Sequence, residues 1–156
     1  MPEVPPRKAV RIERLASGDE ARILAATELF DHAPTEAYTG HFLDESGHVL
    51  LVAYEGDEPA GFVSGVEVAH PDKPVEMFLN ELGVREASRG RGIGRALVAA
   101  LRDLTVERGC AGMWVLTDAD NEAALRAYRA AGAGAPSDTV MLEWVFERPP
   151  SHGGAS

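Results

Sequence analysis

The sequence has a single cysteine, Cys110, and no apolar run that approaches the length of a membrane span. One thiol cannot form an internal disulfide. The five histidines are scattered, with neither an HExxH motif nor a cysteine partner, so the sequence indicates no metal site. The longest apolar stretches of the sequence fall far short of the roughly 18 residues that a helix needs to cross a bilayer. These absences predict chemistry without a metal and no membrane span.

Basic residues are also scarce. Lysine and arginine total 15 against 25 acidic residues, which gives a formal net charge of −10. Such a field repels nucleic acid and anionic membranes and attracts cations, although many cytosolic proteins without a cationic ligand are equally acidic. Residues 1–9 lack the apolar core of a signal peptide, so we expect a cytoplasmic location and neither a nucleic-acid nor a membrane partner.

The length of 156 residues suits one domain. Residues 1–9 and 148–156 are rich in proline, glycine and serine, which predicts flexible tails around a domain at residues 10–147. Apolar periodicity predicts strands at 10–15, 48–54, 60–68, 75–84, 113–117 and 139–147, and helices at about 19–30, 36–43, 93–108 and 121–131. This order predicts an α/β (α+β) fold with a mixed sheet and helices packed on it.

A glycine-rich turn lies between the strand that ends at Val84 and the helix that begins near residue 93. Backbone N–H groups and the helix dipole of such a turn bind phosphate, and its arginines reverse the local sign of the charge. We therefore interpret it as an anion site rather than a purely structural turn. Neither GxxxxGK[ST] nor GxGxxG is present, which argues against a P-loop or a dinucleotide fingerprint.

The R-x-x-G-x-G pattern of Arg89, Gly92 and Gly94 resembles that of the GNAT superfamily of acetyltransferases, and the resemblance extends over residues 80–84, 113–117 and 121–128. It implies a central, mostly antiparallel twisted sheet flanked by helices, with acetyl-coenzyme A as cofactor. In similar enzymes a bulge in the strand before the turn frees backbone groups for the pantetheine arm, and amides of the turn hold the pyrophosphate. The resemblance thus implies these cofactor-binding residues: Leu82, Gly83, Val84, Arg89, Gly90, Arg91, Gly92, Ile93, Gly94, Arg95, Asn121, Ala124 and Tyr128.

Two side chains are candidates for the proton transfers of acetylation, which needs a free amine and a proton for the leaving thiolate but no nucleophile. Alternation along residues 75–84 places Glu81 on an apolar face, where either a bulge or an arginine compensates for it or it is a general base. Tyr128 is either a core residue or the general acid near the coenzyme sulfur. We expect Cys110 to be a packing residue, and the amine to attack directly in a ternary complex.

An acidic loop supplies candidate acceptor contacts. Asp118 and Asp120 precede the helix at 121–131; Asp120 is either its cap or, with Asp118, a ligand of ammonium groups. Residues 78–84 and 113–121 resemble the type I aminoglycoside 3-N-acetyltransferases in particular. That resemblance implies acetylation of the 3-amino group of 2-deoxystreptamine in gentamicin-type drugs, with Glu81, Asp118 and Asp120 in contact with the drug, and hence antibiotic resistance.

Two departures from the family pattern leave the acceptor open. Gly132 is followed by Ala133 rather than an aromatic residue, and Arg89 stands where glutamine is common. Alternatives are an acetyltransferase for another amine (a polyamine, a small metabolite or a protein lysine) and a non-catalytic module that binds acyl-coenzyme A. The resemblance also implies that a homodimer can form, but the sequence shows no interface for it.

Overall fold

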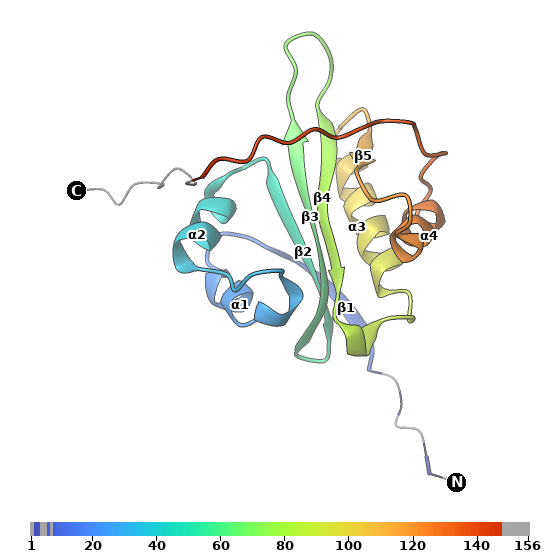
Figure 1. Cartoon of the computed structure of the whole chain (residues 1–156). Coiled ribbons are helices and arrows are strands. Elements are labelled where there is room, and N and C mark those ends of the chain that lie inside the picture. The colour runs from blue at the N-terminus through green and yellow to red at the C-terminus, as the bar shows by residue number, and fades with distance from the viewer. Residues whose placement is uncertain (1, 4–5, 7, 148–156) are drawn as a thin grey trace, which may run out of the picture.

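The computed structural model describes residues 2, 3, 6 and 8–147, and its core is one mixed sheet between two layers of helices (Figure 1). Strands β1 to β4 pair antiparallel in sequence order, and β5 pairs parallel with β4. The predicted fold class, a mixed α/β fold with a mostly antiparallel sheet, is confirmed. The elements are β1 (Val10–Leu15), α1 (Glu20–Leu24), η1 (Thr27–Leu29), α2 (Glu36–Asp44), β2 (His48–Glu55), β3 (Glu58–Val68), β4 (Glu76–Val84), η2 (Glu86–Ser88), α3 (Ile93–Glu107), β5 (Met113–Val115) and α4 (Glu122–Ala130).

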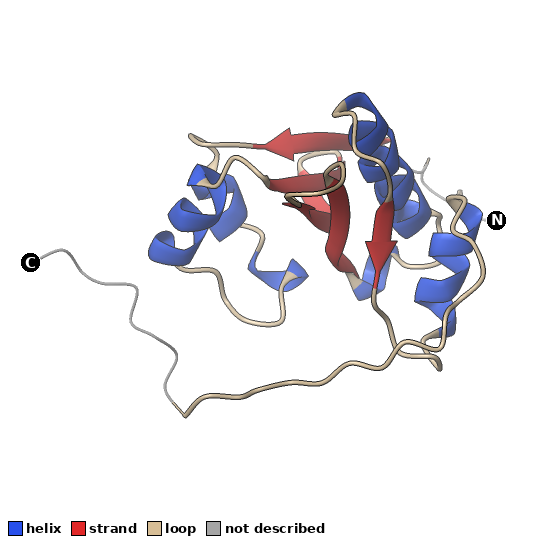
Figure 2. Cartoon of the chain, turned by 90° about the horizontal axis from the view of Figure 1, so that it is seen from above, coloured by secondary structure: helices blue, strands red, loops and turns tan. Residues whose placement is uncertain are grey.

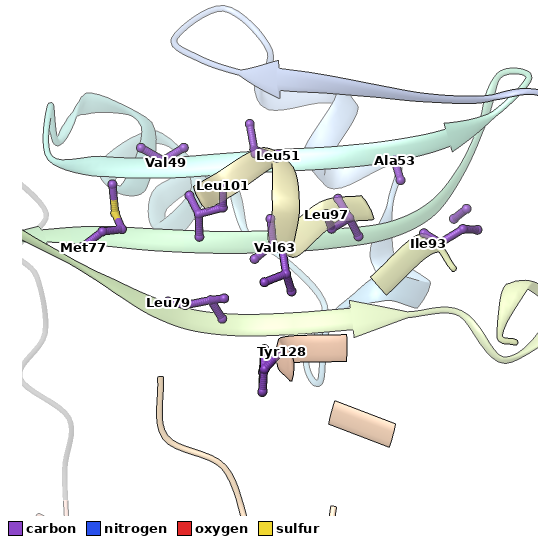
Figure 3. Packing of buried hydrophobic residues seen from close by; sticks show 12 residues of the cluster. Val49, Leu51, Ala53, Val63, Met77, Leu79, Ile93, Leu97, Leu101 and Tyr128 are labelled. Carbon is purple, nitrogen blue, oxygen red and sulfur yellow. The ribbon is translucent and has the colours of Figure 1, made fainter. Parts of the chain in front are cut away.

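The larger apolar cluster lies between the sheet and α3. The buried side of α3 presents Ile93, Leu97 and Leu101, which recur at the helical spacing expected from the sequence. Figure 3 shows them among side chains from three strands. The strand residues of this cluster are Val49, Leu51 and Ala53 of β2, Ala60 and Val63 of β3, and Met77 and Leu79 of β4. This packing fixes the start of α3 against the ends of β3 and β4.

A second cluster covers the opposite face of the sheet, beneath α1, η1 and α2. Its strand residues are the alternate positions of the same strands, among them Leu50, Val52 and Phe62. They pack against Ile23 and Leu29. Because both faces are covered, β2 is buried along almost its whole length, as its continuous apolar sequence indicates.

Two predicted elements are wrong. The helix expected at 19–30 is only α1 followed by the single turn η1. The strand expected at 139–147 is absent, although these residues are described: they pair with no strand in the described part of the chain, and their apolar side chains are exposed. Figure 2 shows this stretch running along the outside of the molecule. Alternation indicates a sequence suited to a strand, but a strand also needs a neighbouring strand to pair with.

Two predicted tails lie wholly or partly outside the described residues: 148–156 entirely, and residues 1, 4, 5 and 7 of the N-terminal one. None of the described helices is both long and apolar enough to cross a membrane.

Candidate active site

The glycine-rich turn positions the start of α3. Gly92 is the N-cap residue with φ +79°, and Gly90 has φ +76°, a backbone region that glycine enters without a Cβ penalty. The first intrahelical acceptor is Gly92, which receives the amide of Ala96 at 3.0 Å. The amides just before Ala96 therefore have no acceptor within the helix. The turn presents these donors together with the positive end of a helix of 15 residues.

A cavity of about 620 Å³, which we call the turn cavity, lies between this turn, the end of β4 and α4. Nearly all the predicted cofactor residues line it, although they come from three separate elements. These residues are Leu82, Gly83, Val84, Arg89, Gly90, Gly92, Ile93, Gly94, Arg95, Asn121 and Ala124. Two predicted members, Arg91 and Tyr128, do not line it.

Positive charge surrounds the turn cavity. The Nε atom of Arg89 donates to the carbonyl of Val84 at 3.1 Å and so closes the turn. Arg95 and Arg126 line the cavity and form no ion pair with any described carboxylate. Arg126 was not predicted. It shares a face of α4 with the small residues Ala123 and Ala130, and this helical spacing is the signal that could have found it.

Arg91 instead anchors the turn from outside. Its guanidinium donates to both carboxylate oxygens of Glu55, each at 2.9 Å, and to the carbonyl of Ala87 at 3.2 Å. The Glu55 side chain is only 6% exposed. A hydrogen bond from Ser88, together with the nearby guanidinium groups of Arg91 and Arg85, lowers the pKa of Glu55. The Arg91 side chain is therefore held by Glu55, a supporting residue that the sequence did not predict, and the role of the Arg91 amide in holding the pyrophosphate stays a prediction.

The sheet opens beside the turn. β4 pairs with β5 only through Met77, Phe78 and Leu79. Past Leu79, this edge of β4 has no strand partner among the described residues, while the opposite edge remains paired with β3 as far as Val84. The main-chain N–H and C=O groups of residues 80–84 that point away from β3 therefore have no strand beside them among the described residues and lie next to the two cavities.

The bulge of β4 lies earlier than predicted. Ser64 pairs with Glu81 and Gly65 pairs with Leu79, so Asn80 is the extra residue, and the expected bulge at Leu82 to Val84 is wrong. One extra residue reverses the alternation of side chains. Glu81 therefore leaves the apolar face of Leu79 and is exposed. The expectation that a bulge turns this carboxylate to solvent is confirmed, and the expectation that it is buried is wrong.

Gly83 has a packing role in place of the predicted bulge. A Cβ at this position would lie 2.8 Å from Cε1 of Phe62 and 3.2 Å from the carbonyl oxygen of Leu29. Only glycine lets β4 lie this close to η1 and to the second apolar cluster.

A smaller cavity of about 260 Å³, the carboxylate cavity, adjoins the turn cavity. Glu81 lines it together with a carboxylate that the sequence did not predict, Asp31, from the loop between η1 and α2. No local pattern marks Asp31, because only the fold brings that loop to β4. The two cavities share Leu82, Gly83, Asn121 and Ala124 as a common wall.

Tyr128 lines the carboxylate cavity and also belongs to the larger apolar cluster, with 8% of its surface exposed (Figure 3). Burial raises the pKa of its phenol, so the hydroxyl keeps its proton at neutral pH. The Asn121 side chain accepts the amide of Ala124 at 3.2 Å, which confirms it as the cap of α4. Asn121 and Ala124 also stand in the wall between the cavities.

The other acidic candidates lie elsewhere. Asp118 and Asp120 are exposed and line neither the turn cavity nor the carboxylate cavity. Asn121, not Asp120, is the N-cap of α4. Cys110 lines neither cavity, and burial, assisted by the charge of Glu67, raises the pKa of its thiol. A protonated thiol outside both cavities fits packing rather than covalent catalysis.

The model of the acetyltransferase (GNAT) family matches residues 15–133. The chain belongs to this family. GNAT proteins are acetyltransferases that use acetyl-coenzyme A, and the matched residues include both cavities and the turn between β4 and α3.

Two curated relatives are mycothiol acetyltransferases. The protein of Saccharopolyspora erythraea is 29% identical over 139 residues, which cover 81% of this chain and 44% of the relative. That of Streptosporangium roseum is 36% identical over 104 residues, which cover 61% of this chain and 30% of the relative. The chain thus spans less than half the length of these relatives.

Solved structures share the GNAT fold over the whole core. An aminoglycoside acetyltransferase from an uncultured soil metagenomic sample, meta-AAC0020 in complex with sisomicin, superimposes with a TM-score of 0.81 at 20% identity, covering 88% of this chain and 97% of that one. The aminoglycoside N-acetyltransferase AAC(6')-Iy in complex with CoA has a TM-score of 0.73 at 19% identity, with 91% and 99% covered. At sequence identities of about 20%, this structural similarity shows a shared fold and nothing about the substrate.

Proposed function

We propose that this GNAT protein transfers the acetyl group of acetyl-coenzyme A to an amine of a small polycationic acceptor of the aminoglycoside class. One observation carries the proposal: two cavities of opposite charge share a wall at the open edge of β4. The turn cavity carries unpaired arginines and free amides, which suits a diphosphate. The carboxylate cavity carries Asp31 and Glu81, which suits ammonium groups.

The residues around the turn cavity fit the coenzyme. The amides at the start of α3 bind the pyrophosphate, and Arg95 and Arg126 add positive charge. The open edge at residues 80–84 holds the pantetheine arm through main-chain hydrogen bonds, in the manner of a strand added to a sheet. Asn121 and Ala124 bring that arm to the carboxylate cavity. When bound, the coenzyme supplies the acetyl thioester.

The carboxylate cavity supplies both proton-transfer groups. A carboxylate oxygen of Glu81 accepts a proton from the bound ammonium, directly or through one water, and leaves a free amine. The phenol of Tyr128, kept protonated by its raised pKa, donates its proton to the departing sulfur. A free amine attacks a thioester without help from an enzyme nucleophile, so the transfer is direct, and Cys110 takes no part.

The sequence resemblance at residues 78–84 and 113–121 favours one particular acceptor, the 3-amino group of 2-deoxystreptamine. Acetylation there would give the protein a role in antibiotic resistance. Several neighbours in fold are aminoglycoside acetyltransferases, and one of them is in complex with sisomicin. A second candidate is favoured by the curated relatives, which are named for mycothiol. For that candidate, the acceptor is mycothiol that lacks its acetyl group.

The test is turnover of the purified protein with acetyl-coenzyme A and a panel of amines, followed by release of the free thiol. The panel contains gentamicin, kanamycin, desacetyl mycothiol, spermidine and a lysine peptide, and NMR of the product locates the acetylated nitrogen. We expect rapid turnover with gentamicin and acetylation of its 3-amino group. Turnover only with desacetyl mycothiol, spermidine or the peptide would contradict the aminoglycoside as acceptor and support acetyl transfer to another amine. Bound coenzyme without turnover of any amine would overturn the catalytic proposal and leave a binding module.

A further inference from the structure

The sheet face that carries Glu81 is covered by helices over only part of its width. Gly83, two residues after Glu81, faces Phe62 and Leu29 at the second apolar cluster, and alternate residues of a strand share a face. Among the described residues, that cluster takes its strand side chains from β1, β2 and β3 and none from β4 or β5. Figure 1 shows the same arrangement, with α1 and α2 beside β2 and away from β5. The β4 and β5 part of this face therefore lies outside the second cluster.

An aromatic pair occupies this uncovered part. Phe78 of β4 and Trp114 of β5 are register partners, and their rings stack with centroids 4.4 Å apart at an angle of 29°. Met77 and Leu79, on either side of Phe78, are buried in the larger cluster beneath α3. Alternation therefore places Phe78 and Trp114 on the face of Glu81. Trp114 is nevertheless 42% exposed, so Phe78 supports one side of the indole and leaves its remaining surface open.

Leu116 joins this pair to the carboxylate cavity. It lies two residues after Trp114, is 47% exposed and lines that cavity. A chain that continues in extended form past β5 carries both side chains on one side. We call Phe78, Trp114 and Leu116 the stacking platform. The platform begins at the wall of the carboxylate cavity and leads away from it along β5.

The carboxylate cavity is too small for a whole acceptor of several rings. Its volume of about 260 Å³ lies below the roughly 300–1,000 Å³ of pockets that enclose drug-sized ligands. On one side it adjoins the turn cavity, which the coenzyme occupies in the proposed function, and on another it meets Leu29 and Phe62 of the packed second cluster. The wall at Leu116 leads instead to an exposed apolar surface. An acceptor with its first ring beside Glu81 therefore gains contact by extending along β5, over Trp114.

We propose that the stacking platform is a second acceptor subsite, in which the indole of Trp114 binds a neighbouring ring of a multi-ring amino sugar whose first ring lies in the carboxylate cavity. The inference rests on the proposed function, which it makes more specific. Ammonium and hydroxyl substituents make the C–H groups of such a ring electropositive, and the face of an indole is electronegative. Ammonium groups are attracted to that face too, most strongly to that of tryptophan. A linear polyamine offers the charge without a ring face, so the platform favours acceptors of more than one ring.

Removal of the indole tests the subsite when a multi-ring acceptor is compared with the single ring 2-deoxystreptamine. Trp114→Ala should raise KM for gentamicin by about tenfold or more and keep kcat within about twofold, because the platform touches no reacting atom. KM for 2-deoxystreptamine and for acetyl-coenzyme A should change by less than about twofold, because neither molecule reaches the platform. Unchanged turnover of the single ring also shows that the variant folds.

Two further substitutions separate an aromatic surface from an apolar one. Trp114→Phe keeps a ring on Phe78 and should raise KM for gentamicin by less than about threefold, whereas Trp114→Leu keeps apolar volume without a π face and should behave like Trp114→Ala. Trp144→Ala is the matched control, because Trp144 is the other tryptophan of the chain, is 77% exposed and lines neither the turn cavity nor the carboxylate cavity. The control should leave every kinetic constant unchanged.

Fluorescence gives a readout that does not depend on turnover. In Trp144→Phe the remaining tryptophan is Trp114. Gentamicin added to this variant with coenzyme A should shift the emission to the blue, because the second ring displaces water from the indole. The same addition of 2-deoxystreptamine should leave the emission unchanged.

The outcomes separate the subsite from the reaction. With gentamicin still acetylated, equal effects of Trp114→Ala on both acceptors, no effect on either, or an emission unchanged by gentamicin would overturn the subsite alone. An emission already blue-shifted without gentamicin and unaffected by it would do so as well, because another part of the protein would then cover Trp114. Gentamicin that shifts the emission without being acetylated would support the subsite and contradict the proposed reaction. Gentamicin that neither binds nor reacts would overturn both.

Discussion

The guanidinium of Arg91 holds the carboxylate of Glu55 in a two-pronged ion pair, with both nitrogen–oxygen distances 2.9 Å. Arg91 is in the glycine-rich turn and Glu55 ends β2, so the pair ties the turn to the end of this strand across 36 residues of sequence. Arg85 adds a contact to Glu55 at 3.6 Å. The amides of the turn are thus held in place before any anion arrives.

Glu55→Gln should weaken the affinity for acetyl-coenzyme A and lower the free energy of unfolding by about 1–3 kcal/mol, because it removes the charge that orders Arg91. Calorimetric titration and denaturant unfolding measure the two effects. Glu58→Gln is the matched control: Glu58 also pairs with Arg85, at 3.1 Å, but its side chain is 65% exposed. That control should change either quantity by less than about 0.5 kcal/mol. Equal effects of both substitutions would contradict the anchoring role of Glu55.

The same pair predicts how stability depends on pH. The pKa of Glu55 is lowered in the folded protein, so its contribution is fully present above the ordinary carboxyl pKa of 4.5 and is lost as pH falls through the lowered value. Between about pH 6 and about pH 3, the wild type should lose more unfolding free energy than Glu55→Gln does. If the unfolding free energies of the two proteins changed with pH in parallel, the Glu55 carboxylate would make no pH-dependent contribution to stability.

Gly92→Glu should abolish binding of acetyl-coenzyme A, because it places a bulky anion among the amides at the start of α3 and strains a residue with φ +79°. Gly109→Glu separates these two causes. Gly109 follows α3 with φ +75° and open space around it, so the same strain and charge arise at the other end of the helix. Both should lose about 1–2 kcal/mol of stability, and only Gly92→Glu should lose the coenzyme. If Gly92→Glu kept its affinity for acetyl-coenzyme A, the glycine-rich turn would not be part of the coenzyme site.

Glu81→Gln should lower kcat with the preferred amine by about 100-fold or more while coenzyme affinity stays unchanged, because the base is lost and the turn cavity is untouched. Steady-state rates across pH, with a binding titration beside them, measure this. An unchanged rate at every pH would rule Glu81 out as the base.

Asp31→Asn should raise KM for a polycationic acceptor by about tenfold, which corresponds to about 1.4 kcal/mol, and leave kcat near the wild-type value. Asp31 lines the carboxylate cavity, but in the proposed mechanism it moves no proton. Asp118→Asn makes the same change at an exposed residue outside both cavities and should raise KM less. A larger rise in KM for Asp118→Asn than for Asp31→Asn would instead indicate that the loop of Asp118 and Asp120 is the main contact of the acceptor.

Most of the residues that line the turn cavity could be predicted from the sequence alone, because most of them follow one another along the chain. A strand, three glycines and a helix start are contiguous, and the phosphate chemistry depends on backbone geometry that glycine makes recognisable. Gly90 and Gly92 have the positive φ that this geometry needs. The face of α3 that packs on the sheet followed equally from helical spacing.

The acceptor side could not be predicted in the same way. Asp31 reaches the carboxylate cavity from a loop far away in sequence and belongs to no local pattern. Glu55, which anchors the glycine-rich turn on the coenzyme side, was missed for the same reason. The face of Glu81 depends on one extra residue, Asn80, whose position is set by pairing with β3. The expected strand at 139–147 fails for a related reason, since whether a strand forms depends on which edge is free to receive it.

The open edge of β4 also affects how the protein can change over evolution. Main-chain N–H and C=O groups are the same for almost every amino acid, so substitutions at residues 80–84 alter packing but leave the hydrogen-bonding edge in place; only proline deletes a donor. A ligand bound by this edge therefore imposes little constraint on side-chain identity. In the proposed function Asp31 and Glu81, in contrast, act through their side chains, so single substitutions there would change the acceptor preference and leave the binding of the coenzyme arm at the edge of β4 unchanged.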